Sequence, residues 1–266
     1  MIVIDDADDP RLAVFRFKER RLASRPQRRD DSGDGLFLAE GDLVVERALQ
    51  AGCVPMVSLV DAAHPPTGLT ERLEALAPVF GGGDQVRMMV TQLGVPNSVV
   101  TVFHRPARAT LDEVIGRSQR VVVIEAVDNP ANVGAIIRNA VGLGWDGLLV
   151  DHTSADPLSR RSLRVSMGHA LHLPYARYPD IAELIRQMTD VGYSVCALTP
   201  AADALDVGAL RIEGRVAVVI GSERAGLSAA ALASTTHRVR IPMANGVDSL
   251  NAAAASAIAC FALRPS

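Results

Sequence analysis

VVVIEAVDNPANVGAIIRNAVGLG, residues 121–144, joins an apolar run to a polar turn and then to a helical pattern. The run VVVIE, followed directly by turn-forming residues, predicts a buried strand over 121–125. Pro130 stiffens the turn, and Asn132 is a candidate cap for the helix that follows. The packing face of that helix is expected at Ile136, Ile137 and Ala140. A strand, a short turn and an amphipathic helix in this order are typical of a parallel sheet covered by helices.

Four further apolar runs with turn signals follow the same plan. They cover residues 147–150, 194–199, 216–221 and 238–243. Near-continuous apolar strands separated by helices indicate a parallel sheet that is buried on both faces. Ligands of such sheets gather beyond the carboxyl ends of the strands. A site is therefore expected in the loops that follow strands 121–125, 194–199, 216–221 and 238–243.

The loop after strand 216–221 reads GSERAGLS. Gly221 at the strand end permits a ligand to approach the backbone closely. A short helix is expected to begin over residues 224–227. Glu223 is then either a cap of that helix or a hydrogen-bond partner of a substrate, and both roles stay open.

The loop after strand 238–243 leads into the last helix. Pro242 is expected to end the strand, and the pair Asn245-Gly246 predicts a turn. Asp248 or Ser249 is the expected cap of the helix. Its run of alanines, AAAASAIA, suits either a close crossing of a neighbouring helix or simple helix propensity.

The first hundred residues alternate short strands and helices. Strands are expected over 36–40, 55–61 and 99–106, and helices over 42–52, 67–77 and 84–94. Thr67 or Thr70 is the expected start of the second helix. The stretch 104–114, with a proline and arginines before a new helix start, indicates a linker.

Composition limits the class of protein. Of the 266 residues, 48% are hydrophobic, enough for a sizeable core. No apolar run reaches the roughly 18–20 residues of a membrane span, and the acidic start MIVIDDADDP is unlike a secretory signal, so a soluble cytoplasmic protein with no membrane partner is expected. The three cysteines and six histidines show no metal-binding or redox spacing, so buried reduced thiols and no metal are expected.

The net charge of −3 does not by itself suggest a nucleic-acid partner, but the charge is unevenly distributed. Residues 11–29 hold eight basic residues against the single acid Glu19. They are Arg11, Arg16, Lys18, Arg20, Arg21, Arg25, Arg28 and Arg29. Such a basic leader could neutralise RNA phosphates, or it could be an ordinary solvated surface.

Taken together, the three loops resemble those of the SpoU (TrmH-like) family of RNA ribose 2′-O-methyltransferases, in the SPOUT superfamily. NPANVGAIIRNA matches the first family motif, IGSERAGL the second, and IPM followed by SLNAAAASAI the third. Their order and spacing agree, and the resemblance spans about residues 119–264. The N-terminal part, LFLAEGDLVVERAL above all, is similar to the family's L30e-like substrate-binding domain.

The resemblance implies an α/β architecture of two domains. Residues 1–107 would form the L30e-like RNA-binding domain with its basic leader, 108–118 a linker, and 119–266 a methyltransferase domain folded as a trefoil knot. It also implies a homodimer with active sites near the interface, S-adenosyl-L-methionine as cofactor, and RNA as substrate. Ribosomal RNA is expected in preference to transfer RNA, but the resemblance does not decide between them.

The resemblance further assigns roles to individual residues. The expected catalytic residues are Arg138, Asn132, Glu223, Ser249 and Asn251. Arg138 would bind the phosphate and assist removal of the proton, and the other four would orient the hydroxyl, the phosphate and the loops. Backbone groups that would hold the cofactor belong to Leu198, Thr199, Gly221, Ile241, Met243 and Leu250.

Two other functions fit the sequence less well. A catalytically retired RNA-binding dimer of the same fold is the main alternative, although the polar residues of all three motifs are present. A nicotinamide-dependent enzyme is disfavoured because the sequence has no G-x-G-x-x-G fingerprint.

Overall fold

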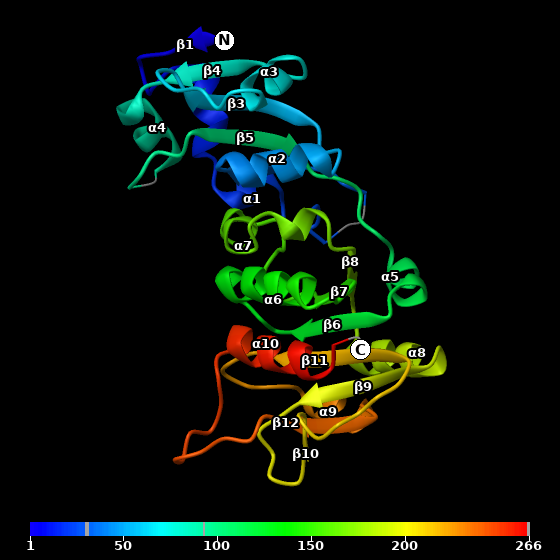
Figure 1. Ribbon diagram of the computed structural model, residues 1–266. Helices are drawn as coiled ribbons and strands as arrows, with labels where there is room; N and C mark the ends of the chain where they lie inside the picture. Colours follow the sequence, from blue (N-terminus) through cyan, green and yellow to red (C-terminus); the bar gives the residue numbers. More distant parts are fainter. Residues whose placement is uncertain (30–31, 93, 265–266) are drawn as a thin grey trace. The chain divides into compact units, whose positions relative to one another are not determined.

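The computed structural model describes residues 1–29, 32–92 and 94–264 (Figure 1). The chain divides into two compact units, each with its own sheet. Unit 1 combines Met1–Ala107 with Leu158–His172, and unit 2 combines Arg108–Pro157 with Leu173–Ser266.

Unit 1 is built on a five-stranded sheet with the order β1-β4-β3-β5-β2. Its strands are β1 (Ile2–Val3), β2 (Leu36–Glu40), β3 (Pro55–Asp61), β4 (Val79–Gly82) and β5 (Val99–His104). β1, β4 and β3 run parallel, whereas β5 pairs antiparallel with β3 and β2. Its helices are η1 (Pro10–Arg16), α1 (Glu19–Leu22), α2 (Asp42–Gln50), α3 (Leu69–Glu74), α4 (Asp84–Thr91), α7 (Arg160–Val165) and η2 (His169–Leu171).

The strands and helices expected in residues 36–106 are all present in unit 1. All three helices differ at their ends, and α2 ends at Gln50 rather than at residue 52. α3 begins after Gly68, whose positive φ of 75° suits glycine, rather than at Thr67 or Thr70. α4 ends before Gln92, and the last part of the expected helix 84–94 includes Leu93, which lies outside the described residues.

Unit 2 is built on a seven-stranded sheet with the order β10-β12-β9-β11-β6-β7-β8, in which all pairs are parallel. Its strands are β6 (Arg120–Glu125), β7 (Gly147–Asp151), β8 (Tyr175–Tyr178), β9 (Tyr193–Leu198), β10 (Leu205–Asp206), β11 (Arg215–Gly221) and β12 (His237–Arg240). Its helices are α5 (Leu111–Arg117), α6 (Pro130–Gly142), α8 (Ile181–Asp190), α9 (Ala229–Ser234) and α10 (Ala252–Ala262).

The parallel sheet predicted from the apolar runs is confirmed. The side chains of Val121 to Ile124 are fully buried, as expected for a strand covered on both faces. α5, α8 and α9 share one buried cluster with β6, β9 and β11. α10 packs against α6 and β11, and α6 and α10 lie side by side in Figure 1. The predicted packing face of α6, with Ile136 and Ile137 fully buried, is also confirmed.

The segment 158–172 belongs to unit 1, although it lies inside the expected domain 119–266. Its helix α7 packs against β2. The carboxylate of Glu40, only 2% exposed, forms ion pairs with Arg160 and Arg164 of α7. Because a buried charge requires charged partners, these contacts tie the segment to unit 1.

Residues 108–118, expected as a linker, form part of unit 2. Thr110 and Glu113 make a capping box that starts α5 there. Val114 and Ile115 of that helix lie in the buried cluster of unit 2. An amphipathic helix with a buried face is a domain element rather than a tether.

The caps of the two helices nearest the pocket described below differ from the expected ones. Asn129, not Asn132, caps α6 and accepts a hydrogen bond from the backbone of residue 131, because Pro130 takes the first helical position. Asn251 caps α10 by accepting from the backbone of residues 253 and 254. Asp248 and Ser249, the expected caps, lie earlier in the loop. In both places a neighbouring polar residue has taken the capping role.

Two other expected boundaries are wrong. The residues from 224 to 227 form a turn, and the short helix α9 begins only after its cap Ser228. β12 ends at Arg240, so Ile241 and Met243 are loop residues rather than strand residues. Pro242 between them has no N–H to donate to a sheet.

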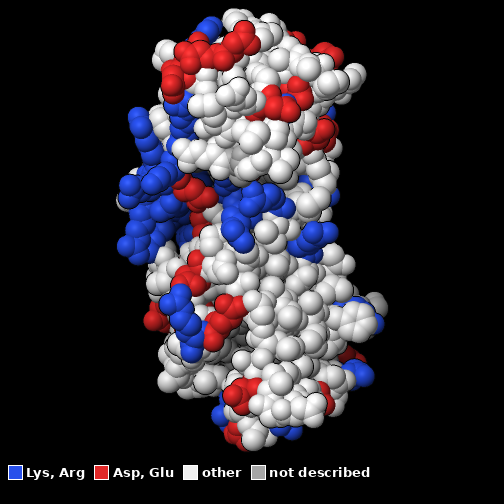
Figure 2. Space-filling model, turned by 90° about the vertical axis from the view of Figure 1, so that its left-hand side faces the viewer, with Lys and Arg blue, Asp and Glu red and all other residues white. Residues whose placement is uncertain are grey.

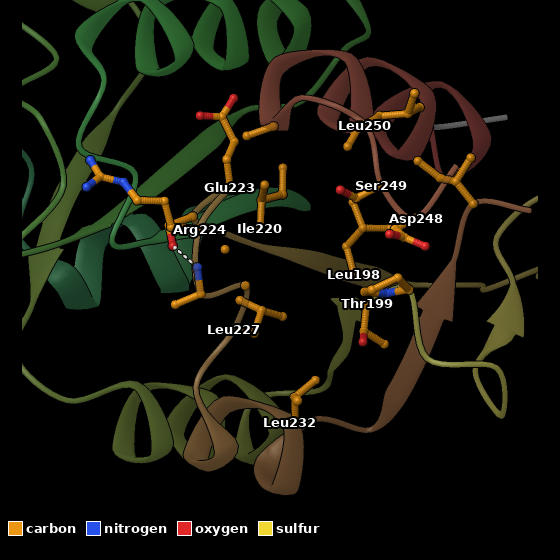
Figure 3. A pocket seen from close by; sticks show the side chains of 18 of the residues that line it. Leu198, Thr199, Ile220, Glu223, Arg224, Leu227, Leu232, Asp248, Ser249 and Leu250 are labelled. Atoms are coloured by element: carbon orange, nitrogen blue, oxygen red, sulfur yellow. Dashed lines mark hydrogen bonds between the residues drawn. The ribbon is translucent and has the colours of Figure 1, made fainter. Parts of the chain in front are cut away.

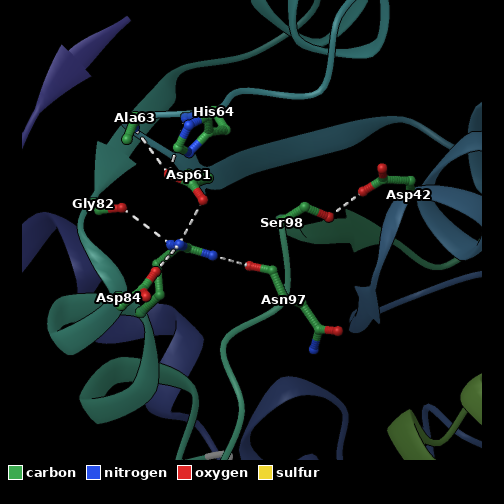
Figure 4. A network of polar contacts seen from close by, with 9 residues as sticks. Asp42, Asp61, Ala63, His64, Gly82, Asp84, Asn97 and Ser98 are labelled. Carbon is green, nitrogen blue, oxygen red and sulfur yellow. Dashed lines mark hydrogen bonds and ion pairs between the residues drawn. The ribbon is translucent and has the colours of Figure 1, made fainter.

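A buried arginine joins several segments of unit 1, and Figure 4 labels its partners Asp61, Gly82 and Asn97. Arg87 of α4 has a side chain only 3% exposed and pairs with Asp61 at 2.8 Å. Its Nε donates to the carbonyl of Gly82 at 3.0 Å, and its guanidinium also donates to the carbonyl of Asn97. One side chain thereby joins α4, the ends of β3 and β4, and the loop before β5.

The thiols, possible metal ligands and possible membrane spans can be described from the structure. Cys53, Cys196 and Cys260 are free and buried, and burial raises the pKa of Cys53 to about 11 and of the other two to about 12. Within the described ranges, no cluster of His, Cys, Asp and Glu is arranged to hold a metal ion. Among those same residues, no helix has the length and apolar character needed to cross a membrane.

Candidate active site

A cavity of about 460 Å³ opens at the carboxyl ends of β9 and β11 in unit 2 (Figure 3). The chain segments that line it are the loops after β9, β11 and β12, the start of α10, and Leu232 of α9. All six residues expected at a cofactor lie in its lining, namely Leu198, Thr199, Gly221, Ile241, Met243 and Leu250. The position predicted for a site, beyond the carboxyl edge of the sheet, is therefore occupied by a pocket.

The walls of the cavity are mainly apolar. Leu198, Ile220 and Leu232 surround it together with Leu227 and Leu250, and Figure 3 shows these side chains around one space. Its polar groups come from a few residues, which are Thr199, Ser222, Glu223, Arg224, Asp248 and Ser249. An apolar cavity with a few polar groups is the usual form of a small-molecule site.

Gly221 has a specific steric role at the end of β11. A Cβ atom at this position would lie 2.4 Å from the carbonyl carbon of Gly226. Residues 222 and 226 form an isolated β-bridge, and the N–H of Gly226 donates to the carbonyl of Ser222 at 2.9 Å. The close approach predicted for Gly221 is therefore made by the chain's own backbone, which folds back to shape one wall.

The loop between β12 and α10 contains the predicted turn. Asn245 and Gly246 have positive φ angles of 56° and 72°, and Val247 N–H donates to the carbonyl of Ala244 at 3.2 Å. Two central residues with positive φ define a type I′ turn, for which Asn-Gly is the preferred pair. This turn reverses the chain just before Asp248 lines the cavity.

Three polar side chains from three different segments meet beside the cavity. Asn132 of α6 donates through Nδ2 to Glu223 Oε1 at 2.8 Å. Asn251 at the start of α10 donates to Asn132 Oδ1 at 3.2 Å and also to Glu223 Oε1. Asn132 is 7% exposed, so this network is partly removed from water, and Glu223 is held by two amides instead of capping a helix. We call Asn132, Glu223 and Asn251 the polar triad.

The other two expected catalytic residues lie differently. Ser249 is exposed and lines the cavity, two residues before Asn251. Arg138 is exposed on α6 and does not line the cavity, and no ion pair or hydrogen bond joins its side chain to another described residue. It follows Asn132 by six residues, which corresponds to about 9 Å along the helix and roughly 240° around it. One chain therefore brings together four of the five expected residues and leaves Arg138 apart.

Two further contacts tie the first and second loops together and were not expected from the sequence. Arg224 pairs with Asp128 at 2.6 Å, with both side chains exposed. The N–H of Ser228 donates to Glu125 Oε2 at 2.9 Å. Because these partners are about one hundred residues apart in the chain, no local pattern could have indicated them.

The basic leader of unit 1 lies on η1, α1 and the turns that follow. Local acids neutralise part of it: Arg11 pairs with Asp9 and Arg16 with Asp8. The hydrogen bond from the Arg11 side chain lowers the pKa of Asp9 to about 2. In Figure 2 basic side chains gather on the face shown.

Helix α7 adds basic residues that the sequence analysis did not assign. The N–H of Arg160 donates to the carboxylate of Glu19 in α1 at 2.8 Å, so the two helices adjoin within unit 1. Arg161 of α7 is exposed, and the Arg164 side chain is 47% exposed. The basic surface of unit 1 thus has contributions from two distant parts of the chain.

Comparison with known proteins identifies the family. The SpoU rRNA Methylase family matches residues 119–261. A Mycobacterium tuberculosis (strain ATCC 25618 / H37Rv) protein named as an uncharacterized tRNA/rRNA methyltransferase is 37% identical over 96% of this chain and 89% of its own. The 23S rRNA (guanosine(2553)-2'-O)-methyltransferase RlmP of Bacillus subtilis (strain 168) is 28% identical over 86% of this chain and 88% of its own. The crystal structure of an AdoMet-bound rRNA methyltransferase from Sinorhizobium meliloti is similar with a TM-score of 0.82 at 25% identity, covering 98% of this chain and 96% of that one.

A parallel α/β sheet with an apolar pocket at its carboxyl edge is the arrangement in which open α/β proteins bind small molecules. The chain belongs to the SpoU rRNA Methylase family, and with it to the methyltransferases that modify RNA. The family resemblance seen in the three loops is confirmed.

Proposed function

We propose that the protein transfers a methyl group from S-adenosyl-L-methionine to a ribose 2′-hydroxyl of RNA, and that ribosomal RNA is its substrate rather than transfer RNA. The name of the Bacillus subtilis relative specifies both a 2′-O position and 23S rRNA. The Sinorhizobium meliloti structure is of an rRNA methyltransferase with AdoMet bound. The observation that carries the proposal is the polar triad, which gathers residues of all three motifs beside one pocket.

The pocket suits the cofactor. Its volume of about 460 Å³ is within the range of small-molecule sites. The apolar walls around Leu198 and Ile241 can sandwich a flat adenine ring, and backbone groups beside Thr199 and Gly221 can satisfy its polar edge. The lining of the cavity, which must accept a positively charged sulfonium, includes the acidic residues Glu223 and Asp248. When bound, S-adenosyl-L-methionine supplies an activated methyl group.

The remaining chemistry falls to side chains of the protein. A ribose hydroxyl is weakly acidic, so it must be oriented and polarised before it can react. Ser249 lines the cavity and can hydrogen-bond this hydroxyl, while Glu223 accepts from the amide of Asn251 and so fixes the start of α10 beside the cavity. Arg138 binds the neighbouring phosphate. Because a guanidinium stays protonated in proteins and is a poor base, phosphate binding is its main role, and proton removal is assisted by its charge.

We propose that Arg138 acts in the pocket of a partner chain in a homodimer. Arg138 is exposed and lies apart from the triad of its own chain. The adjoining helix α10 leaves Ile258 and Phe261 39% and 56% exposed, so apolar surface lies next to it. A two-fold pairing through α6 and α10 would cover this surface and carry Arg138 to the partner.

A mixing experiment tests this arrangement. Arg138→Ala and Asn251→Ala are each expected to be inactive as homodimers. If Arg138 acts across the interface, a mixed dimer contains one intact site, and an equal mixture regains about a quarter of wild-type activity after subunit exchange. If Arg138 acts within its own chain, the mixture stays inactive.

We propose the trefoil-knot path for the C-terminal segment. After β12, residues Ile241, Met243 and Leu250 share the cavity with the loop that follows β11, and the chain then enters α10 against α6. Ala252 and Ala259 of α10 are buried, so small side chains permit the close crossing. A crystal structure whose C-terminus can be withdrawn without passing through another loop would exclude the knot.

Unit 1, with its L30e-like resemblance, is proposed to bind the RNA through the basic leader and α7. The leader residues not paired with Asp8 or Asp9, together with Arg161 and Arg164, form a cationic surface suited to phosphates. A cytoplasmic location, where ribosomal RNA is available, belongs to the same proposal.

The function is tested by supplying the protein with methyl-labelled S-adenosyl-L-methionine and ribosomal or transfer RNA from a strain that lacks the gene. We expect label in ribosomal RNA at one nucleotide, which then resists alkaline cleavage because its 2′-oxygen is blocked. Label in transfer RNA alone would overturn the substrate choice. Tight RNA binding with no heat of cofactor binding in calorimetry would support a retired RNA-binding dimer instead.

A further inference from the structure

The carboxylate of Asp151, at the carboxyl end of β7, is surrounded by hydrogen-bond donors. Its Oδ1 accepts from the backbone of Ala126 at 3.1 Å and of Ser154 at 3.0 Å, and its Oδ2 accepts from the backbone of Thr153 at 3.0 Å. The hydroxyls of Ser154 and Thr153 also donate to it. Five donors from two segments on one carboxylate make a rigid local structure.

The segment that Asp151 holds is strained. Ala126 follows β6 directly and has a φ of +57°, in the left-handed region that alanine rarely adopts. The next residue, Val127, is fixed on both sides: its N–H donates to Ser154 Oγ at 2.9 Å, and its carbonyl accepts from the N–H of Ala155 at 2.9 Å. Residues 151–155 therefore hold the backbone of residues 126 and 127 through hydrogen bonds.

These hydrogen bonds lie immediately before the first motif loop. Two residues after Val127, Asn129 caps α6, and α6 carries Asn132 into the polar triad. The direction in which the chain leaves β6 therefore fixes where α6 begins and whether Asn132 reaches Glu223. The backbone of Asp151 is itself fixed, because Arg177 of β8 donates to its carbonyl at 2.6 Å.

We propose that Asp151 is a positioning residue of the active site, which holds Ala126 in its left-handed conformation and thereby places Asn132 against Glu223 and Asn251. The proposal rests on the proposed function for its catalytic consequence. Asp151 neither lines the cavity nor touches the triad, so it acts through the backbone of residues 126–129.

The charge state of Asp151 agrees with this role. Burial by itself raises the pKa of this carboxyl, but the hydrogen bonds from Ser154, Thr153 and Ala126 together lower the pKa below its ordinary value. The carboxylate is therefore ionised at neutral pH and can accept from all of its donors.

The chain provides a matched control at the opposite end of the same two strands. Asp146 directly precedes β7, and its carboxylate accepts from the backbone N–H groups of Gln119 and Arg120 at the start of β6. It thus makes the same kind of contact to the same strand, but at the edge of the sheet away from the pocket.

The experiment compares four purified full-length variants with the wild type: Asp151→Ala, Asp146→Ala, Ala126→Gly and the double variant Asp151→Ala with Ala126→Gly. We expect Asp151→Ala to lower kcat on the RNA substrate by tenfold to about a hundredfold, with the dissociation constant of S-adenosyl-L-methionine changed less than about threefold. Ala126→Gly alone should stay near the wild type, since glycine adopts positive φ without strain. The double variant should have a kcat about fivefold higher than that of Asp151→Ala, because glycine removes the free-energy cost of holding an alanine in the left-handed conformation.

The outcomes separate positioning from general stability. Asp146→Ala should lower Tm while leaving kcat near the wild-type value well below Tm. Equal losses of kcat in Asp151→Ala and Asp146→Ala, or no rescue by Ala126→Gly, would overturn the proposal.

Hydrogen exchange of residues 126–133 gives a readout that does not depend on activity. We expect faster exchange there in Asp151→Ala and not in Asp146→Ala, and unchanged exchange would also overturn the proposal. If the wild type methylates no RNA, the proposed function fails, and the exchange measurement alone decides the role of Asp151.

Discussion

We expect Gly221→Ala to damage the pocket more than any other single-methyl change at the carboxyl edge of the sheet. The added Cβ would lie 2.4 Å from the carbonyl carbon of Gly226, 2.5 Å from its oxygen and 2.6 Å from the nitrogen of Leu227. All three are backbone atoms, so no side chain can rotate to make room.

The size of the effect follows from these distances. Non-bonded carbon atoms settle at about 3.5–4.0 Å, so the loop after β11 must retreat by about 1 Å. Overpacking of this kind costs about 1–3 kcal/mol, which corresponds to a loss in Tm of roughly 3–10 °C for a chain of this size. Since the displaced loop forms one wall of the cavity and carries Glu223, cofactor affinity should fall by about tenfold or more, or about 1.4 kcal/mol.

Thermal unfolding measures the first loss, and titration calorimetry with S-adenosyl-L-methionine measures the second. Gly116→Ala is the matched control, because a Cβ on this α5 glycine meets nothing within 4 Å. It should raise stability by about 0.5–1 kcal/mol through helix propensity and leave cofactor affinity unchanged. If Gly221→Ala retained both the wild-type Tm and the wild-type affinity, the backbone contact with Gly226 would not shape the pocket, and the reasoning would be refuted.

Three other predictions concern separate parts of the molecule. Arg138→Ala should abolish methyl transfer but leave the dissociation constant of the cofactor within a few fold, as measured by calorimetry, because Arg138 does not line the cavity; near-normal turnover on the true RNA would exclude its role. Replacing Arg20, Arg21 and Arg25 of the leader by serine should weaken RNA binding and flatten its dependence on salt concentration, whereas unchanged binding would make the leader a solvated surface only. Hydrogen bonds hold the pKa of Asp151 below its ordinary value of 3.8, so its ionised form adds stability that is fully present above pH 3.8 and is lost as the pH falls through the lower folded-state pKa. The difference in unfolding free energy between wild type and Asp151→Asn should therefore shrink as the pH is lowered from 3.8 through the folded-state pKa. A difference that does not change with pH would contradict this charge state of Asp151.

The strands of unit 2 and the place of the pocket could be predicted from the sequence because both depend on local patterns. A run such as residues 121–124 is apolar throughout only if both faces of the strand are buried, and the structure buries all four side chains. Parallel strands then bring the loops after β9, β11 and β12 to one edge. All six expected cofactor residues consequently line one cavity.

What could not be predicted depends on contacts between distant residues or on competition between neighbours. Asn129 and Asn132 are both competent caps, and only the position of Pro130 decides between them. The placement of 158–172 in unit 1 depends on the buried Glu40, more than one hundred residues earlier. The motif predicts a catalytic role for Arg138, but a motif does not show which way a side chain points from a helix. Its position apart from the cavity could therefore not be predicted.

Because residues 158–172 belong to unit 1, the polypeptide passes from one unit to the other three times, after residues 107, 157 and 172. No single cut can release either unit intact. A fragment that starts at residue 108 would keep Arg160 and Arg164 but lose the carboxylate of Glu40 that neutralises them. Neither half is a removable module, so exchanging RNA-binding halves between relatives would require transplanting this short insertion together with the first hundred residues.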